Sequence, residues 1–243
     1  MRWVTDQTGR FPQRPHYDPE ELDEECETLI GTFLRAKHGV ATYPVTTNDL
    51  TILIEREVES LDPYADLSQE GDDVEGVTDF TPGRKPRVRI ASELSEQAWR
   101  EHRLRTTLTH ELGHVKFHNF LWSFDQAVRV SLFSEQTTTP PPRCKRETIL
   151  GASVSDWMEW QAGYASGALL MPRTPLLQVA RTGVEAAGAF GPVSLITPAG
   201  QDLIHRVQLA FQVSADAARV RLLQLRLATE QPPVPALLTP PGS

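Results

Sequence analysis

Near the start of the chain, apolar residues recur at intervals of three and four, the spacing of one face of an α-helix. The preceding residues, Asp18-Pro19-Glu20-Glu21, are typical of a helix start: they supply an N-cap, an early proline and acids near the positive end of the helix dipole. Gly39 suits the end of this helix. Cys26 lies on the apolar face, so we expect it to be buried as a small apolar residue. The full face comprises Leu22, Cys26, Leu29, Ile30 and Phe33.

The next segments predict a helix, a loop and a β-hairpin. A helix is expected from about Thr47, with an apolar face, and the acidic stretch 62–73 is expected to be a loop with solvated charges. Residues 74–80 and 87–90 are short strand-like runs joined by Thr81-Pro82-Gly83-Arg84, which predicts a hairpin. An exposed edge of this hairpin could hold an extended peptide, although a purely structural hairpin explains the pattern equally well.

The remaining periodic segments predict an α+β fold that is mostly helical, with a small antiparallel sheet and C-terminal helices. Residues 134–146 contain Pro140-Pro141-Pro142, which cannot continue a helix and predicts a loop. The Pro-rich tail 229–243 is expected to be disordered. Further helices are predicted at about 95–118, 153–170, 175–187, 201–211 and 214–227.

Composition narrows the class of protein. The 243 residues are 40% hydrophobic and 23% charged, as in an ordinary globular protein, and no apolar run is long enough to span a bilayer. Residues 1–17 are polar and lack an apolar signal core, so we do not expect export. Cys26 and Cys144 are the only cysteines, which fits a reducing cytoplasm. The net charge of −8 disfavours non-specific nucleic-acid binding.

The most informative stretch is the His-Glu-x-x-His sequence at 110–114. On a helix, His110 and His114 lie about 40° apart around the axis, so they could share one metal ion. Glu111, between them, could reach a water molecule bound to that ion. The alternative is a chance occurrence on a surface helix. A roughly opposite apolar stripe, which would bury the other flank of the helix, comprises Leu104, Leu108, Leu112 and Val115.

A catalytic zinc ion needs a third protein ligand, and Glu159 is the best candidate. It shares one predicted helical face with small residues, which would let this helix approach another closely. Asp156 is a weaker alternative, and Glu159 could instead be an ordinary solvated acid. His118 lies about 12 Å along the helix from His110, too far to share the ion. We expect His118 to contact the ligands from behind or to pack. The small residues are Ala162, Gly163, Ser166 and Gly167.

Taken together, these motifs resemble the ImmA/IrrE metallopeptidases. The resemblance is carried by residues 109–114, by Glu159-x-x-Ala162 and by Leu169-Leu170-Met171-Pro172, and it covers roughly residues 49–225. It implies that His110, His114 and Glu159 bind zinc and that Glu111 activates water for peptide hydrolysis. We therefore divide the chain into an N-terminal helical segment (1–46), a zincin-like catalytic domain (47–190), a C-terminal helical pair (191–228) and a tail (229–243).

The resemblance also implies a substrate. Such a cytoplasmic protease cuts a DNA-binding repressor with a helix-turn-helix and so releases transcription under stress or during mobile-element induction. A net charge of −8 would favour encounter with a basic partner of this kind. Tyr164 and His118 are candidates for stabilising the oxyanion. Cys144 could cap the open metal position, or it could be an unremarkable free thiol.

Residues 207–222 support a rival hypothesis, because they read like a helix-turn-helix that could make the chain itself a DNA-binding regulator. Similar tails in the peptidase family look like packing helices. A second rival is a non-catalytic metal-binding interaction module, although Glu111 would then have no use as a base. The side chains that could meet phosphates are Arg206, Arg219, Arg221 and Arg226.

Overall fold

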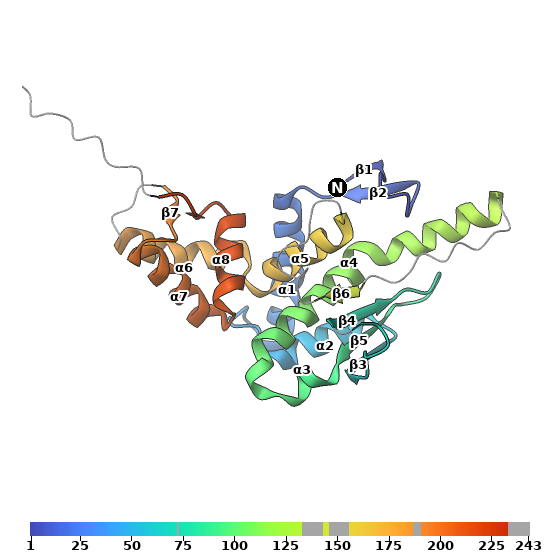
Figure 1. The fold of residues 1–243 in the computed structure, drawn as a ribbon, viewed down its shortest axis with the longest axis horizontal. Helices are drawn as coiled ribbons and strands as arrows, with labels where there is room; N and C mark the ends of the chain where they lie inside the picture. Colours follow the sequence, from blue (N-terminus) through green and yellow to red (C-terminus); the bar gives the residue numbers. More distant parts are fainter. Residues whose placement is uncertain (72, 133–142, 146–155, 187–190, 233–243) are drawn as a thin grey trace, which may run out of the picture.

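The computed structural model describes residues 1–71, 73–132, 143–145, 156–186 and 191–232 (Figure 1). Its helices are α1 (Pro19–His38), α2 (Thr47–Glu57), α3 (Ser92–Glu96), the 3-10 helix η1 (Ala98–Arg100), α4 (Glu101–Leu132), α5 (Trp157–Leu170), α6 (Arg173–Ala186), α7 (Pro198–Phe211) and α8 (Ala215–Gln224). Its strands are β1 (Arg2–Thr5), β2 (Gln13–His16), β3 (Ser60–Ala65), β4 (Val74–Asp79), β5 (Arg87–Ala91), β6 (Arg143–Lys145), β7 (Val193–Ser194) and β8 (Ala228–Thr229). This arrangement confirms the mostly helical α+β class.

The predicted ends of the first two helices are confirmed. At the start of α1, the Asp18 amide donates to Glu21 Oε2 at 3.0 Å. At its end, Gly39 adopts a left-handed φ of 79° and its amide bonds to the carbonyl of Arg35. Thr46 caps α2 by accepting from the Asp49 amide. Cys26 is fully buried on the inner face of α1, as its position in the apolar pattern predicted.

The main sheet differs from the prediction. Its strand order is β3-β5-β4-β6, with β4 antiparallel to β5 as expected. However, β3 runs parallel to β5, so the sheet is mixed and residues 62–65 are not the loop that was predicted. Asp62 and Pro63 are uncommon in strands, and the partner strand β5 lies far away in the sequence, so no local pattern indicates this strand. Strand β6, residues 143–145, falls within the predicted loop 134–146. The other residues of that loop lie outside the described part.

The hairpin does not have the free edge that was predicted. Strand β6 pairs antiparallel with β4, with Cys144 opposite Gly76, and β3 pairs with the outer side of β5. Both edges of the hairpin are therefore occupied by segments of the same chain. The alternation that predicted β4 and β5 carries no information about which strands flank them.

Several helix and strand boundaries were also missed. The helix predicted at 95–118 is split into α3, η1 and α4, because Gln97 is extended with φ −110° and ψ 99°. Helix α4 then continues beyond His118 to Leu132. The segment 1–46, predicted to be helical, also contains the antiparallel hairpin β1–β2. Within the described ranges, no helix is both long and apolar enough to cross a membrane.

The C-terminal helices share the core of the rest of the protein. Apolar residues of α7 and α8 belong to the same buried cluster as those of α1, α2, α4 and α5. A buried ion pair reinforces this packing: Arg221 Nη2 of α8 lies 2.6 Å from Asp23 Oδ1 of α1. The Tyr164 hydroxyl of α5 donates to the other Asp23 oxygen at 3.1 Å. Three helices distant in sequence thus meet at the carboxylate of Asp23. The predicted division of the chain into segments at residues 46, 190 and 228 stays a prediction.

We expect Arg221→Met to lower the free energy of unfolding by about 3–5 kcal/mol, because it leaves the Asp23 carboxylate buried without its cation. Arg206→Met is the control. Arg206 also sits on a C-terminal helix, but its i,i+4 pair with Asp202 is exposed, so little change is expected. Denaturant titration of both variants measures the difference. Equal stability of the two would contradict the anchoring role of Arg221.

Candidate metal centre

The centre is built where α4 packs closely against α5. A Cβ added to Gly113 would lie 3.0 Å from the Cα of Ala162, so the two backbones nearly touch. One turn away, Thr109 Oγ1 lies 2.8 Å from Ser166 Oγ across the same interface. The predicted face of small residues is therefore partly correct. Gly167 departs from it, because its nearest neighbours are the side chains of Arg221 and Gln224 on α8.

This packing brings together the three residues expected to bind metal. The distance between the Nε2 atoms of His110 and His114 is 3.1 Å. Glu159 Oε2 lies 3.1 Å from His110 Nε2, and Glu159 Oε1 lies 3.4 Å from His114 Nε2. A tetrahedral zinc ion with bonds of about 2.0–2.1 Å separates its ligand atoms by roughly 3.3 Å. The three side chains, all buried, therefore fit a single metal ion.

The charges of the site favour a bound cation. Burial opposes ionisation of Glu159, but the charge of His114 and hydrogen bonds from both histidines lower the pKa of this carboxyl well below its usual value. Burial likewise disfavours a charged His114 ring, yet the Glu159 carboxylate outweighs it and raises the pKa of His114. The negative charge of Glu159, which raises the pKa of His114, would likewise attract a cation.

Glu111 is held against the sheet rather than in the triad. Its Oε2 accepts a hydrogen bond of 2.5 Å from Thr78 Oγ1 on β4. Its Oε1 is buried and has no hydrogen-bond partner among the described residues. A Cβ at Gly76 would overlap this oxygen, so β4 can approach the carboxylate only because residue 76 is glycine. Burial raises the pKa of Glu111, and the charges of His114 and His110 act against that rise.

Sequence reasoning did not single out Gly76 or Thr78 as parts of the site. The available signal was a glycine in the interior of a predicted strand, which often marks a close approach by another group. Nothing in the local sequence shows that this strand packs beside the helix with the histidines.

The other site candidates fall in different places. His118 Nδ1 lies 3.0 Å from His114 Nδ1, so His118 contacts a triad residue from behind. Burial and the charge of His114 hold the pKa of His118 well below its usual value. The Tyr164 hydroxyl donates to Asp23 of α1, so the structure does not bring it to the triad. Asp156 caps α5 by accepting from the Glu159 amide and is not part of the triad. The side chain of Cys144 lies outside the described part.

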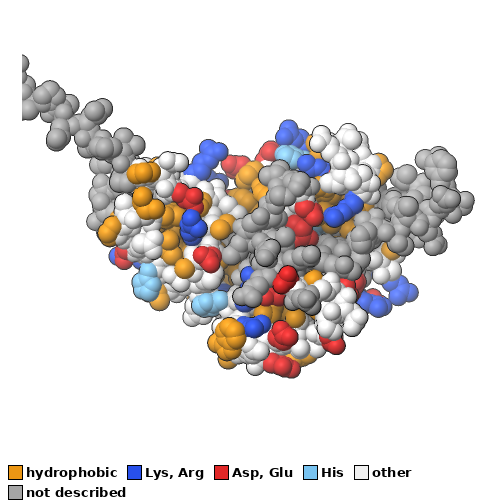
Figure 2. Space-filling view, viewed as in Figure 1, with side chains coloured by type: hydrophobic (Ala, Val, Ile, Leu, Met, Phe, Trp, Pro, Cys, Tyr) orange, Lys and Arg blue, Asp and Glu red, His pale blue; other side chains and the backbone are white. Residues whose placement is uncertain are grey.

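The C-terminal segment forms two helices joined by a short turn, but three of the four arginines expected to meet phosphates are engaged elsewhere. Arg206 pairs with Asp202, Arg219 pairs with Glu230, and Arg221 is fully buried. On the face shown in Figure 2, basic and acidic side chains are interspersed over this part of the molecule. On this face, the described side chains of the C-terminal helices do not form the concentrated positive charge that DNA binding requires.

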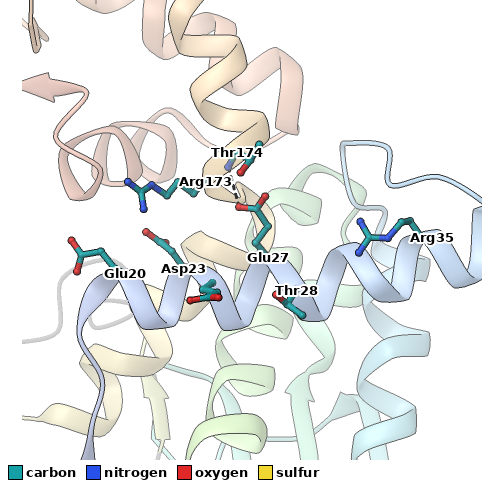
Figure 3. Close-up of a pocket in the computed structure, with 8 residues that line it drawn as sticks. Glu20, Asp23, Glu27, Thr28, Arg35, Arg173 and Thr174 are labelled. Atoms are coloured by element: carbon teal, nitrogen blue, oxygen red, sulfur yellow. Dashed lines mark hydrogen bonds between the residues drawn. The ribbon is translucent and has the colours of Figure 1, made fainter. Parts of the chain in front are cut away.

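A hollow of about 500 Å³ lies apart from the metal centre, between α1 and the start of α6 (Figure 3). Its lining is mixed in charge, with acids from α1 facing Arg173, and Glu27 accepts a hydrogen bond of 3.0 Å from the Thr174 amide. None of the triad residues lines it. The hollow therefore gives no access to His110, His114 or Glu159.

Comparisons with known proteins assign no family. No protein-family model matches the chain, and no curated protein matches it. The metal centre rests on the geometry of its own residues, and the ImmA/IrrE resemblance stays a prediction.

Replacing one triad residue should lower metal binding. We expect Glu159→Gln and His110→Ala to reduce the metal content after dialysis and to weaken affinity in competition with a chromophoric chelator. The control is Asp156→Asn, which removes a neighbouring acid but keeps a good helix cap, so metal binding should be unchanged. Unaltered binding in Glu159→Gln, together with a loss in Asp156→Asn, would assign the third position to Asp156.

Proposed function

We propose that the protein is a zinc-dependent metalloendopeptidase of the ImmA/IrrE type. The observation that carries this proposal is the Glu111 carboxylate, which is buried beside two histidines and has one oxygen without a hydrogen-bond partner among the described residues. A metal centre with only a structural role has no use for such a group. The two histidines and Glu159 match the His₂Glu ligand set of catalytic zinc sites, which leaves one position for water or substrate.

The proposed chemistry divides the work between the ion and the chain. A zinc ion bound there supplies Lewis acidity and lowers the pKa of a water molecule. Glu111 accepts the proton of the attacking water on its free Oε1 and passes it to the nitrogen of the leaving amine. Thr78 holds the other carboxylate oxygen, so the basic oxygen keeps one orientation. Because burial raises the pKa of Glu111, the carboxylate is a stronger base than an exposed one.

The surroundings support a narrow choice of substrate. His110, His114 and Glu111 are fully buried, and β6 occupies the edge of β4 beside Glu111. A peptide added to that edge as a strand would have to displace β6 first. We infer a regulatory protease of the cytoplasm whose substrate is a helix-turn-helix repressor. The net charge of −8 supports encounter with the basic surface of such a repressor.

The first test of this proposal is Glu111→Gln. This change removes the base and keeps the three metal ligands, so hydrolysis should fall by about 10²–10⁴-fold with metal content unchanged. Thr78→Val is the companion variant, because it removes only the bond that orients Glu111 and should cause a smaller loss. If Glu111→Gln hydrolyses substrate as fast as the unaltered protein, Glu111 is not the base. If the unaltered protein hydrolyses no substrate either, the centre is a non-catalytic metal-binding module.

The second test concerns the substrate. Zinc-loaded protein should make a single cut in the helix-turn-helix repressor encoded nearest to its own gene and should leave casein largely intact. Gel electrophoresis and mass spectrometry of the products measure both, with Glu111→Gln as the control for contaminating proteases. Rapid degradation of casein with an intact repressor would contradict the regulatory role and would leave the zinc chemistry standing.

A further inference from the structure

We propose that Pro15, Gln161 and His118 form a hydrogen-bonded relay that sets which ring nitrogen of His114 carries a proton. The relay would leave Nε2 of His114 free to bind the metal ion. This inference rests on the metal centre of the proposed function, but it does not depend on peptidase activity. It makes the N-terminal hairpin, a hundred residues away in sequence, part of the metal centre.

The relay begins at a main-chain carbonyl. The oxygen of Pro15, in β2, can only accept a hydrogen bond, and Gln161 Nε2 lies 3.0 Å from it. The amide nitrogen of Gln161 must therefore face Pro15, and its Oε1 must face the opposite way. Because both side-chain groups of Gln161 are buried, this contact fixes the orientation of the amide.

The next two contacts carry this orientation to the triad. Gln161 Oε1 lies 3.0 Å from His118 Nε2, so Nε2 of that ring must hold the proton. Nδ1 of a neutral His118 then has a lone pair, and it lies 3.0 Å from His114 Nδ1. His114 must donate from Nδ1. When a metal ion displaces the proton that Nε2 shares with Glu159, the lone pair of Nε2, the atom that faces His110 and Glu159, is free to bind it.

The surroundings hold each member of the relay in place. The Trp157 ring stands edge-on to His118, with centroids 5.4 Å apart and an interplanar angle of 87°. The indole nitrogen of Trp157 donates to Asp6 Oδ1 at 3.2 Å, and the Phe11 amide donates to the other oxygen of Asp6 at 3.1 Å. These contacts dock the N-terminal hairpin where the carbonyl of Pro15 reaches Gln161.

The arrangement resembles a metal-bound histidine whose second nitrogen donates to a carboxylate or carbonyl. Here a neutral imidazole takes that place. It orients His114 without adding a negative charge to a site that already contains Glu159 and Glu111. His118 and Gln161 are therefore positioning residues, and their loss should act on metal affinity rather than on substrate.

Two variants of nearly equal size isolate the contact. His118→Leu removes the acceptor for His114 Nδ1 and should weaken zinc affinity by about 10–100-fold. His118→Asn places an amide oxygen near the position of Nδ1 and should restore most of that loss. Tyr164→Phe, which breaks a polar contact of α5 with α1 away from the triad, should leave the affinity unchanged. Competition with a chromophoric chelator measures all three, and circular dichroism checks that each variant is folded.

A second substitution tests whether Gln161 acts through His118. Gln161→Met alone should weaken zinc affinity less than His118→Leu does, because His118 can still accept from His114. In the His118→Leu background it should have almost no further effect, since the relay is already broken. Additive losses would overturn the relay and leave two independent contacts.

Nitrogen NMR of the zinc-loaded, unaltered protein directly tests which ring nitrogens of His114 and His118 carry protons. This measurement does not depend on whether any variant folds. We expect protons on Nδ1 of His114 and on Nε2 of His118, with zinc on Nε2 of His114. A proton on His118 Nδ1, or equal zinc affinity in His118→Leu and His118→Asn, would overturn the relay and leave the metal centre intact. If the unaltered protein binds no zinc, both the centre and the relay are wrong.

Discussion

The close contact between α4 and α5 is the constraint on which the rest of the structure depends. Gly113 and Ala162 bring the two backbones so near that even a Cβ at position 113 would press against the backbone of Ala162. Only at this separation does the short side chain of Glu159 reach two histidines on the neighbouring helix. The small residues of the interface thus set the metal geometry, and the buried polar contact between Thr109 and Ser166 keeps the helices in register.

The other elements each secure one part of this centre. Strand β4 lies against α4 and holds Glu111, the N-terminal hairpin reaches the rear of His114 through Gln161, and α8 binds α1 through Arg221. None of these contacts is local in sequence. Burial of so many polar groups is costly unless each is paired, and most of them are. Glu111 Oε1 is one of several buried side-chain atoms of the described residues without a hydrogen-bond partner, and the proposed chemistry gives it a role.

Local pattern was enough to predict the helix caps, the hairpin and the candidate metal ligands, because each depends on residues a few positions apart. The ligand spacing at His110 and His114 follows from helix geometry alone. Strands β3 and β6 were missed because parallel and distant pairings leave no local periodicity. The contact of Tyr164 was not predictable either, because its nearness to Glu159 in sequence does not show that its hydroxyl binds Asp23 on α1.

The central claim is that two imidazoles and one carboxylate hold a zinc ion between α4 and α5. X-ray absorption at the zinc edge of the loaded protein tests this most directly, because it reports the ligand atoms without requiring a substrate. The account predicts a first shell of nitrogen and oxygen only, at about 2.0–2.1 Å, with the outer-shell scattering of imidazole rings. A sulfur ligand at about 2.3 Å, or a shell without imidazole scattering, would contradict it.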